Sequence, residues 1–129
     1  MRYAFFLLFF ILVDSAWGQV TGPSDIMGNA DMILSGQQIS LYSEQALGGD
    51  RDAANHLGQY FLAIKNDRIR AEKWYLISAE NGDEGAQRTY ANLILQDSKE
   101  NKTRAIFWLK KASQGGNSSA TADLEKLQH

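Results

Sequence analysis

Clustered carboxylates are the residues of this chain with the clearest potential for chemistry. Asp50 and Asp52 lie two positions apart, and Asp83 is followed directly by Glu84. Paired carboxylates can bind a metal ion or act as a general acid and base. Each pair, however, follows a glycine that can end a helix, and negative charge is favoured in the first turn of the next helix. We therefore interpret both pairs as helix caps.

Histidine and cysteine provide no pattern for a metal or catalytic site. The chain has no cysteine and only two histidines, His56 and the C-terminal His129. A zinc or catalytic histidine needs further ligands or a nucleophile at a suitable spacing, and the sequence offers neither these nor a phosphate-binding loop. The sequence therefore predicts a protein that is not an enzyme and that holds no metal and no cofactor.

The elements that position these residues repeat along the chain. In the stretch 71–90, small and aromatic residues recur at helical spacing, and a glycine then separates two helical segments. Trp74 has its counterpart 34 positions later in Trp108, so both are predicted to be largely buried core residues rather than a ligand-stacking pair. The helix-ending glycine recurs at similar spacing, at Gly49, Gly82 and Gly116. A period in the thirties with two helices per unit is typical of an α-solenoid.

The clearest unit has the pattern Ala71-x-x-Trp74-Tyr75-x-x-Ser78-Ala79-x-x-Gly82-Asp83-x-x-Ala86. This pattern resembles the Sel-one-like repeats, close relatives of the tetratricopeptide repeat, and the resemblance spans about residues 38–127. It implies an all-α fold, a short solenoid of two to three helix-turn-helix repeats. It also implies protein–protein scaffolding without catalytic residues. The loop 63–67 departs from the family, because it is shorter than the usual glycine-containing loop.

The same signals predict seven helices and no strand. Asp67 and Asn101 occupy equivalent repeat positions and are predicted to cap the N-termini of the helices that follow them. The helices are expected at about residues 25–34, 37–47, 51–64, 68–81, 84–95, 102–114 and 118–128.

The first 18 residues have the features of a secretory signal peptide. Arg2 precedes an apolar run over 3–13, and the small residues Ala16 and Gly18 suit cleavage before Gln19. The alternative is a retained anchor, but the run is too short to span a hydrocarbon core, which needs about 20 residues. We therefore expect a signal peptide over 1–18, one domain over 19–129, a periplasmic or secreted location and no stable membrane insertion after cleavage.

A strip of polar side chains on the first helix of two successive units is the predicted recognition surface. It is expected on the concave side, between the core positions Ala53, Leu57, Phe61, Ala86, Tyr90 and Ile94. The alternative is a merely solvated face. Since the strip should point outward, substitution of Arg88 or Asn92 is expected to change stability by within about 0.5 kcal/mol. This concave strip consists of Asn55, His56, Gln59, Arg88, Thr89 and Asn92.

Taken together, these features predict an exported module that binds another protein. The net charge of −2 provides no basic footprint for nucleic acid. Small exported proteins similar to this one include periplasmic immunity proteins that block an antibacterial secretion-system effector, so the resemblance implies a partner that is sequestered or inhibited. The alternative is a periplasmic adaptor or regulator of an envelope, signalling or motility assembly. The small size favours the first, because two or three repeats offer one standard interface.

Overall fold

The computed structural model describes residues 32–129, and over this range the chain is all α-helical, with no strand. The all-α prediction is thus confirmed. The predicted helices from residue 37 onward are found within two residues of their expected ends, except that the helix predicted over 51–64 is an α-helix only to Gln59 and continues to Ile64 as a π turn. The helices and helical turns are α1 (Gly36–Leu47), α2 (Arg51–Gln59), η3 (Tyr60–Ile64, a π turn), α3 (Arg68–Glu80), α4 (Glu84–Asp97), η4 (Lys99–Asn101, a 3-10 turn), α5 (Lys102–Gln114) and α6 (Ser118–Gln128).

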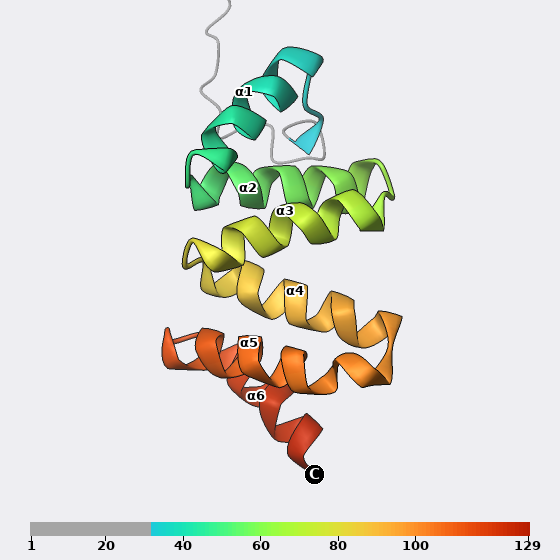
Figure 1. Cartoon of the computed structure of the whole chain (residues 1–129), viewed down its shortest axis with the longest axis vertical. Helices are drawn as coiled ribbons and strands as arrows, with labels where there is room; N and C mark the ends of the chain where they lie inside the picture. The colour runs from blue at the N-terminus through green and yellow to red at the C-terminus, as the bar shows by residue number, and fades with distance from the viewer. Residues whose placement is uncertain (1–31) are drawn as a thin grey trace, which may run out of the picture.

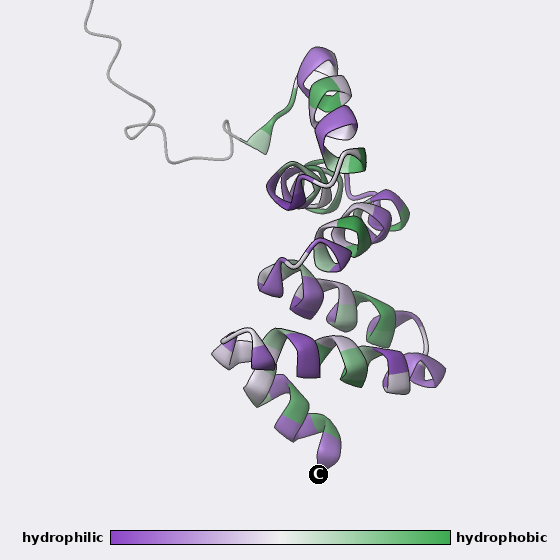
Figure 2. Cartoon of the chain, turned by 60° about the vertical axis from the view of Figure 1, so that its left-hand side comes forward, coloured by the Kyte–Doolittle hydropathy of each residue, from purple (hydrophilic) through white to green (hydrophobic). Residues whose placement is uncertain are grey.

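The six α-helices of this range are stacked in chain order, from α1 at one end to α6 at the other (Figure 1). Each packs chiefly against the helix before it and the helix after it. Hydrophobic and hydrophilic residues alternate along every helix (Figure 2), so none is apolar throughout its length. Within residues 32–129, no helix is long and apolar enough to cross a membrane.

The connections α1–α2, α3–α4 and α5–α6 share one turn geometry. The glycine at each has a left-handed backbone, with φ of 103° at Gly49, 93° at Gly82 and 100° at Gly116. The next residue donates its N–H to a carbonyl five residues back, over 3.0 to 3.2 Å, which closes the first helix of each pair. The side chain of the same residue then caps the second helix. Asp50, Asp83 and Asn117 accept hydrogen bonds from the backbone N–H groups of Ala53, Ala86 and Ala120, respectively.

The connection from α2 to α3 uses an asparagine where a glycine is more usual. The end of the predicted helix 51–64 widens into the π turn η3, in which the Lys65 N–H donates to the Tyr60 carbonyl over 3.1 Å. Asn66 follows with φ of 50°, a left-handed backbone that asparagine tolerates better than most residues. Asp67 then accepts from the Arg70 N–H over 3.0 Å, so its predicted capping role is confirmed. Asn66 thus provides the left-handed backbone that a glycine would otherwise supply in this loop.

The predicted cap at Asn101 is wrong. Its side chain makes no capping bond to α5 and donates instead to the carbonyl of Ile94 over 2.8 Å. The reason is that α4 continues to Asp97, two residues beyond its predicted end, and the 3-10 turn η4 then leads directly into α5. Asn101 is the last residue of this 3-10 turn, with φ of −74° and ψ of 0°, and its side chain satisfies the end of the preceding helix. Ser98 provides the cap at this corner, on the Glu100 N–H.

The core consists of alanines that let the helices approach closely and of rings that fill the remaining space. All six predicted core positions are buried. Gly58 serves the same close approach, because a Cβ at this position would lie 2.9 Å from the ring of Tyr75. Burial raises the pKa of Tyr75 to about 12, and the charge of Asp83 contributes in the same direction.

The two tryptophans differ in burial despite their shared repeat position. Trp108 is 7% exposed and packs edge-to-face on Tyr90, with ring centroids 5.9 Å apart, so its predicted burial is confirmed. Trp74 is only half-buried at the edge of the core. The α2 position equivalent to Tyr90 is Leu57, which has no ring for Trp74 to pack against. A shared sequence position thus did not give a shared environment.

Two predicted segments fall outside the described residues, wholly or in part. The proposed signal peptide over 1–18 lies entirely outside them, and so does most of the helix expected at 25–34. At the end of that expected helix, Ile33 and Leu34 are described and are not helical. The prediction is wrong for these two residues, because Ser35 and Gln38 form a capping box that starts α1 directly after them.

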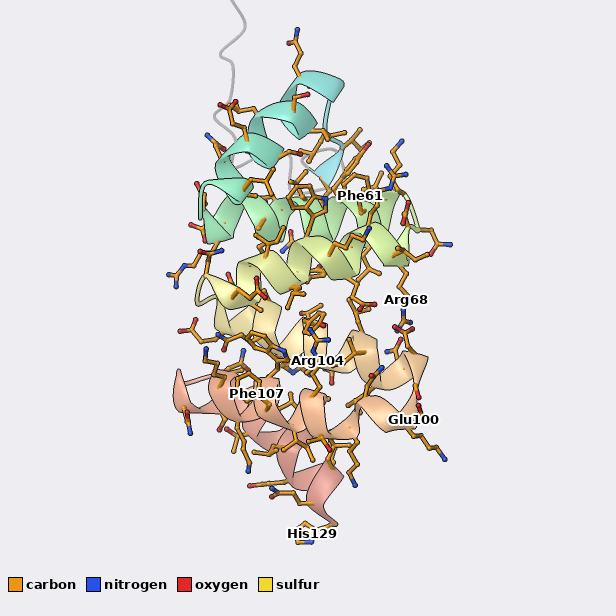
Figure 3. All side chains as sticks on the ribbon, viewed as in Figure 1. Phe61, Arg68, Glu100, Arg104, Phe107 and His129 are labelled. Carbon is orange, nitrogen blue, oxygen red and sulfur yellow. The ribbon has the colours of Figure 1, made fainter. Side chains whose placement is uncertain are left out.

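An ionic cluster at the opposite edge from the glycine turns ties α3 to α4. Arg68, labelled in Figure 3, lies 2.8 Å from the Asp97 carboxylate and donates to the Gln96 side chain and the Leu93 carbonyl. Glu72 lies beside this pair. Burial raises the pKa of Glu72, and a hydrogen bond with the Asp97 carboxyl raises it further, against the opposing charges of Arg68 and Arg104.

The raised pKa of Glu72 predicts a specific dependence of stability on pH. The folded protein binds this proton more tightly than the unfolded chain, so the stabilisation is present below the usual pKa of 4.5 and is lost as the pH rises through the raised value. We expect Glu72→Gln, which is neutral at every pH, to gain more stability relative to the parent at pH 7 than at pH 4.5. Urea unfolding of parent and variant at both pH values measures the gain in unfolding free energy. An equal gain at pH 7 and at pH 4.5 would contradict the prediction.

The unequal burial of the tryptophans predicts unequal costs of truncation. Trp108→Ala should lower the free energy of unfolding by about 3 to 5 kcal/mol, because it leaves a large cavity against Tyr90. Trp74→Ala should cost about half as much, since part of its ring is already in water. Urea denaturation followed by circular dichroism compares the two. A larger loss of unfolding free energy for Trp74→Ala than for Trp108→Ala would contradict this assignment of the more buried ring.

Candidate functional site

The six residues of the concave strip all lie on α2 and α4 and point out of the core. His56 is exposed, and the other five are half-buried between their helix and its neighbours. Core residues alternate with them along both helices, as the helical period requires. The strip nevertheless divides into two halves with different surroundings, one on α2 and one on α4.

The α4 half of the strip is joined to the last helix by a shared carboxylate. The Arg88 Nε atom donates to Asp123 over 2.6 Å, and the Asn92 amide donates to the same oxygen over 3.2 Å. Lys126 lies 3.9 Å from the other oxygen of Asp123. The two strip residues therefore hold α6 in place as well as facing outward. This corrects the expectation that their substitution would leave stability almost unchanged.

Asp123 is the residue that sequence reasoning missed. A signal was present, because Asp123 lies 34 positions after Thr89 and so occupies the next rung of the same repeat surface. Burial raises the pKa of Asp123, but the hydrogen bonds from Arg88 and Asn92 and the charge of Lys126 outweigh burial and lower the pKa below its usual value of 3.8. The carboxylate is therefore ionised at neutral pH and fixes the direction of the Arg88 side chain.

The α2 half of the strip borders a cavity. His56 and Gln59 line a space of about 160 Å³ together with Tyr60 and with Met32 and Leu34 from the segment before α1. The His56 ring also stacks on Tyr42 of α1, with centroids 5.7 Å apart and an angle of 21° between the rings. This half thus combines an apolar recess with two polar groups at its edge.

The geometry of the strip is suited to binding rather than to bond making. Arg88 uses Nε for Asp123, and within residues 32–129 its two terminal nitrogens have no hydrogen-bond partner. Thr89 follows Arg88 on α4 and adds a hydroxyl group, and Asn55 adds an amide to the α2 half of the strip. Within the same range, no group of three His, Cys, Asp or Glu side chains could hold a metal ion. The strip can therefore offer donors to carbonyl or carboxylate oxygens of a partner.

The lowered pKa of Asp123 predicts how the contact responds to acid. We expect Asp123→Asn to lower stability at pH 7 by about 1 kcal/mol, the magnitude of a partly exposed ion pair with hydrogen bonds. The stabilisation should be present above pH 3.8 and lost as the pH falls through the lowered pKa, where parent and variant should converge. Thermal unfolding from pH 7 to about pH 2.5 tests this, with Glu125→Gln on the same helix as the control. A deficit that persists in acid would exclude the ion pair as its cause.

Comparison with known proteins finds one informative similarity. No protein-family model matches the chain, and no solved structure matches it. The chain is 26% identical to the uncharacterized protein YibG of Escherichia coli (strain K12) over 132 aligned residues, which cover 96% of this chain and 86% of that protein. The chain is thus similar along nearly its whole length to a bacterial protein whose own description assigns no function.

Proposed function

We propose that this chain is an exported binding module that captures one partner protein and sequesters or inhibits it, most like a periplasmic immunity protein against an antibacterial secretion-system effector. The observation that carries this proposal is the α4 half of the concave strip, in which the Asp123 carboxylate orients the side chains of Arg88 and Asn92. A binding surface that is already ordered loses less conformational entropy on association.

The fold that we propose is a short solenoid of Sel-one-like repeats. Its support is the recurrence of one turn geometry at Gly49, Gly82 and Gly116, together with the packing of each helix mainly on its neighbours in sequence. In such a stack the equivalent helices of successive units line one face and together form an extended binding surface. Alternate helices α2 and α4 carry the strip, and α6 adds Asp123 to it.

The exported setting rests on the amino-terminal sequence and on the bacterial relative. Residues 1–18 have the features of a secretory leader, which would deliver the domain to the periplasm or the medium. The similarity to a protein of Escherichia coli supports a bacterial context for this leader. A periplasmic adaptor or regulator of an envelope, signalling or motility assembly is the second candidate, and the charge distribution of α5, described below, is the observation that favours it.

A charge swap across the strip tests the proposed surface. Arg88→Asp combined with Asp123→Arg should preserve the ion pair and the position of α6, while it reverses the charges that a partner meets. Capture of the partner from periplasmic extract should therefore fall by at least about tenfold, since like charges at a desolvated contact are strongly unfavourable. The melting temperature should remain within a few degrees of that of the parent.

The control and the biological readout separate the two candidates. Lys65 lies between η3 and α3, outside the strip, so Lys65→Glu should leave capture of the partner intact. If the chain is an immunity protein, the captured partner should stop growth when it is exported alone, and co-export of the chain should restore growth. Growth that the partner does not affect would favour the adaptor, and equal capture by the swapped variant would exclude the concave strip as the contact surface.

A further inference from the structure

Helix α5 differs from its neighbours in charge. It contains Lys102, Arg104, Lys110 and Lys111, and it is the one α-helix in the range 32–129 that has a basic residue and no acidic one. All four side chains are exposed. The whole chain has a net charge of −2, so this helix concentrates positive charge against the overall balance. Such segregation raises the local concentration of negatively charged partners.

The four cations of α5 form no ion pair within residues 32–129, a property that they share with Lys65, Lys73 and Lys99. Arg51, Arg68, Arg70 and Arg88 each form an ion pair with a nearby aspartate. None of the four basic residues of α5 forms one with any carboxylate of residues 32–129. The arginines elsewhere in this range thus form ion pairs within the fold, whereas Arg104 and the three lysines of α5 place four unpaired cations on one helix.

An exposed aromatic ring lies in the middle of these charges. Phe107 is 55% exposed and is the one aromatic residue among the large hydrophobic side chains that are exposed in the described range. Its ring packs edge-to-face on Trp108 at 5.2 Å, and the Lys111 ammonium lies 5.9 Å from its centre. Arg104 and Phe107 project from α5 one turn apart (Figure 3). Trp108 and Lys111 thus hold the ring in place while more than half of it faces solvent.

We propose that Arg104, Phe107, Lys110 and Lys111 form a docking surface, the basic face of α5, for an acidic segment of a partner protein that places an apolar side chain on Phe107. Carboxylates of such a segment would neutralise cations that form no ion pair within residues 32–129. Arginine and exposed aromatic rings are enriched in protein interfaces, and charge complementarity steers association.

An anionic membrane fits this surface less well than an acidic protein segment. A helix that lies in a membrane interface needs a broad apolar face. The apolar face of α5 is already used, because Ala105, Trp108, Leu109 and Ala112 are buried in the core. Phe107 alone would provide little area for insertion among lipids. A peptide needs only one such contact beside its charges.

This surface goes beyond the proposed function, because it shares no residue with the concave strip. The strip on α4 is joined to α6, whereas the basic face belongs to α5, whose Arg104 lies over the ring of Tyr90 at 5.3 Å. A chain with both surfaces could hold two proteins together. That arrangement corresponds to the adaptor, which is the second candidate function.

The test uses synthetic peptides and vesicles as defined probes. The acidic peptide alternates glutamates with leucine and phenylalanine, and its control has glutamine at every glutamate. We expect the parent to bind the acidic peptide at least about tenfold more tightly than the glutamine peptide, and more weakly as salt is added. Fluorescence anisotropy measures both, and sedimentation with phosphatidylglycerol vesicles tests the membrane.

Matched variants assign the binding to this face. Lys110→Glu combined with Lys111→Glu should weaken peptide binding by at least about tenfold, and Phe107→Ala by about threefold or more. Lys65→Glu combined with Lys99→Glu changes the net charge equally, in loops at the opposite edge of the stack, and should bind like the parent. Circular dichroism should show that all variants keep the parent's helicity. The proposal is overturned if the parent binds no peptide, if it binds only the vesicles, or if either α5 variant binds as tightly as the parent.

Discussion

A left-handed glycine followed by a capping side chain forms every second connection between the α-helices of residues 32–129. At Gly49, Gly82 and Gly116 the backbone takes a conformation that other residues adopt only with strain. The next residue closes the first helix with its N–H and opens the second with its side chain. Since both events depend on two adjacent residues, the turn is specified locally, and the same turn recurs at three connections within residues 32–129.

Close packing between these pairs depends on small side chains. Alanines at 0 to 3% exposure occur on all six α-helices of the described range, so neighbouring backbones can approach each other there. Gly58 extends this principle to Tyr75, where even a Cβ would be too close. The larger rings fill what remains, and their environments differ from one pair to the next. Trp108 meets Tyr90, whereas Trp74 has no equivalent ring and remains half-buried.

The surfaces proposed for binding are the helix faces that this packing leaves open. On α4, the outward face is ordered by the carboxylate of Asp123, so its donors are held in position before a partner arrives. On α5, the outward face is ordered by rings, and its cations form no ion pair within the described range. The surface on α4 therefore combines positive and negative side chains in an internal network, whereas the surface on α5 presents positive side chains alone. Partners of different chemistry would suit the two.

The sequence by itself determined the helices, because helix-ending glycines, capping residues and apolar spacing act over a few residues and can be recognised one segment at a time. The same local rules located the core positions and showed which side chains of α2 and α4 point outward. Only the tertiary structure decided what those side chains meet. The pairing of Arg88 with Asp123 joins residues 35 positions apart, and Asn101 turned back to Ile94 because α4 ran two residues further than its local signals indicated. Such contacts depend on how helices are placed in space, so no local pattern in the sequence could specify them.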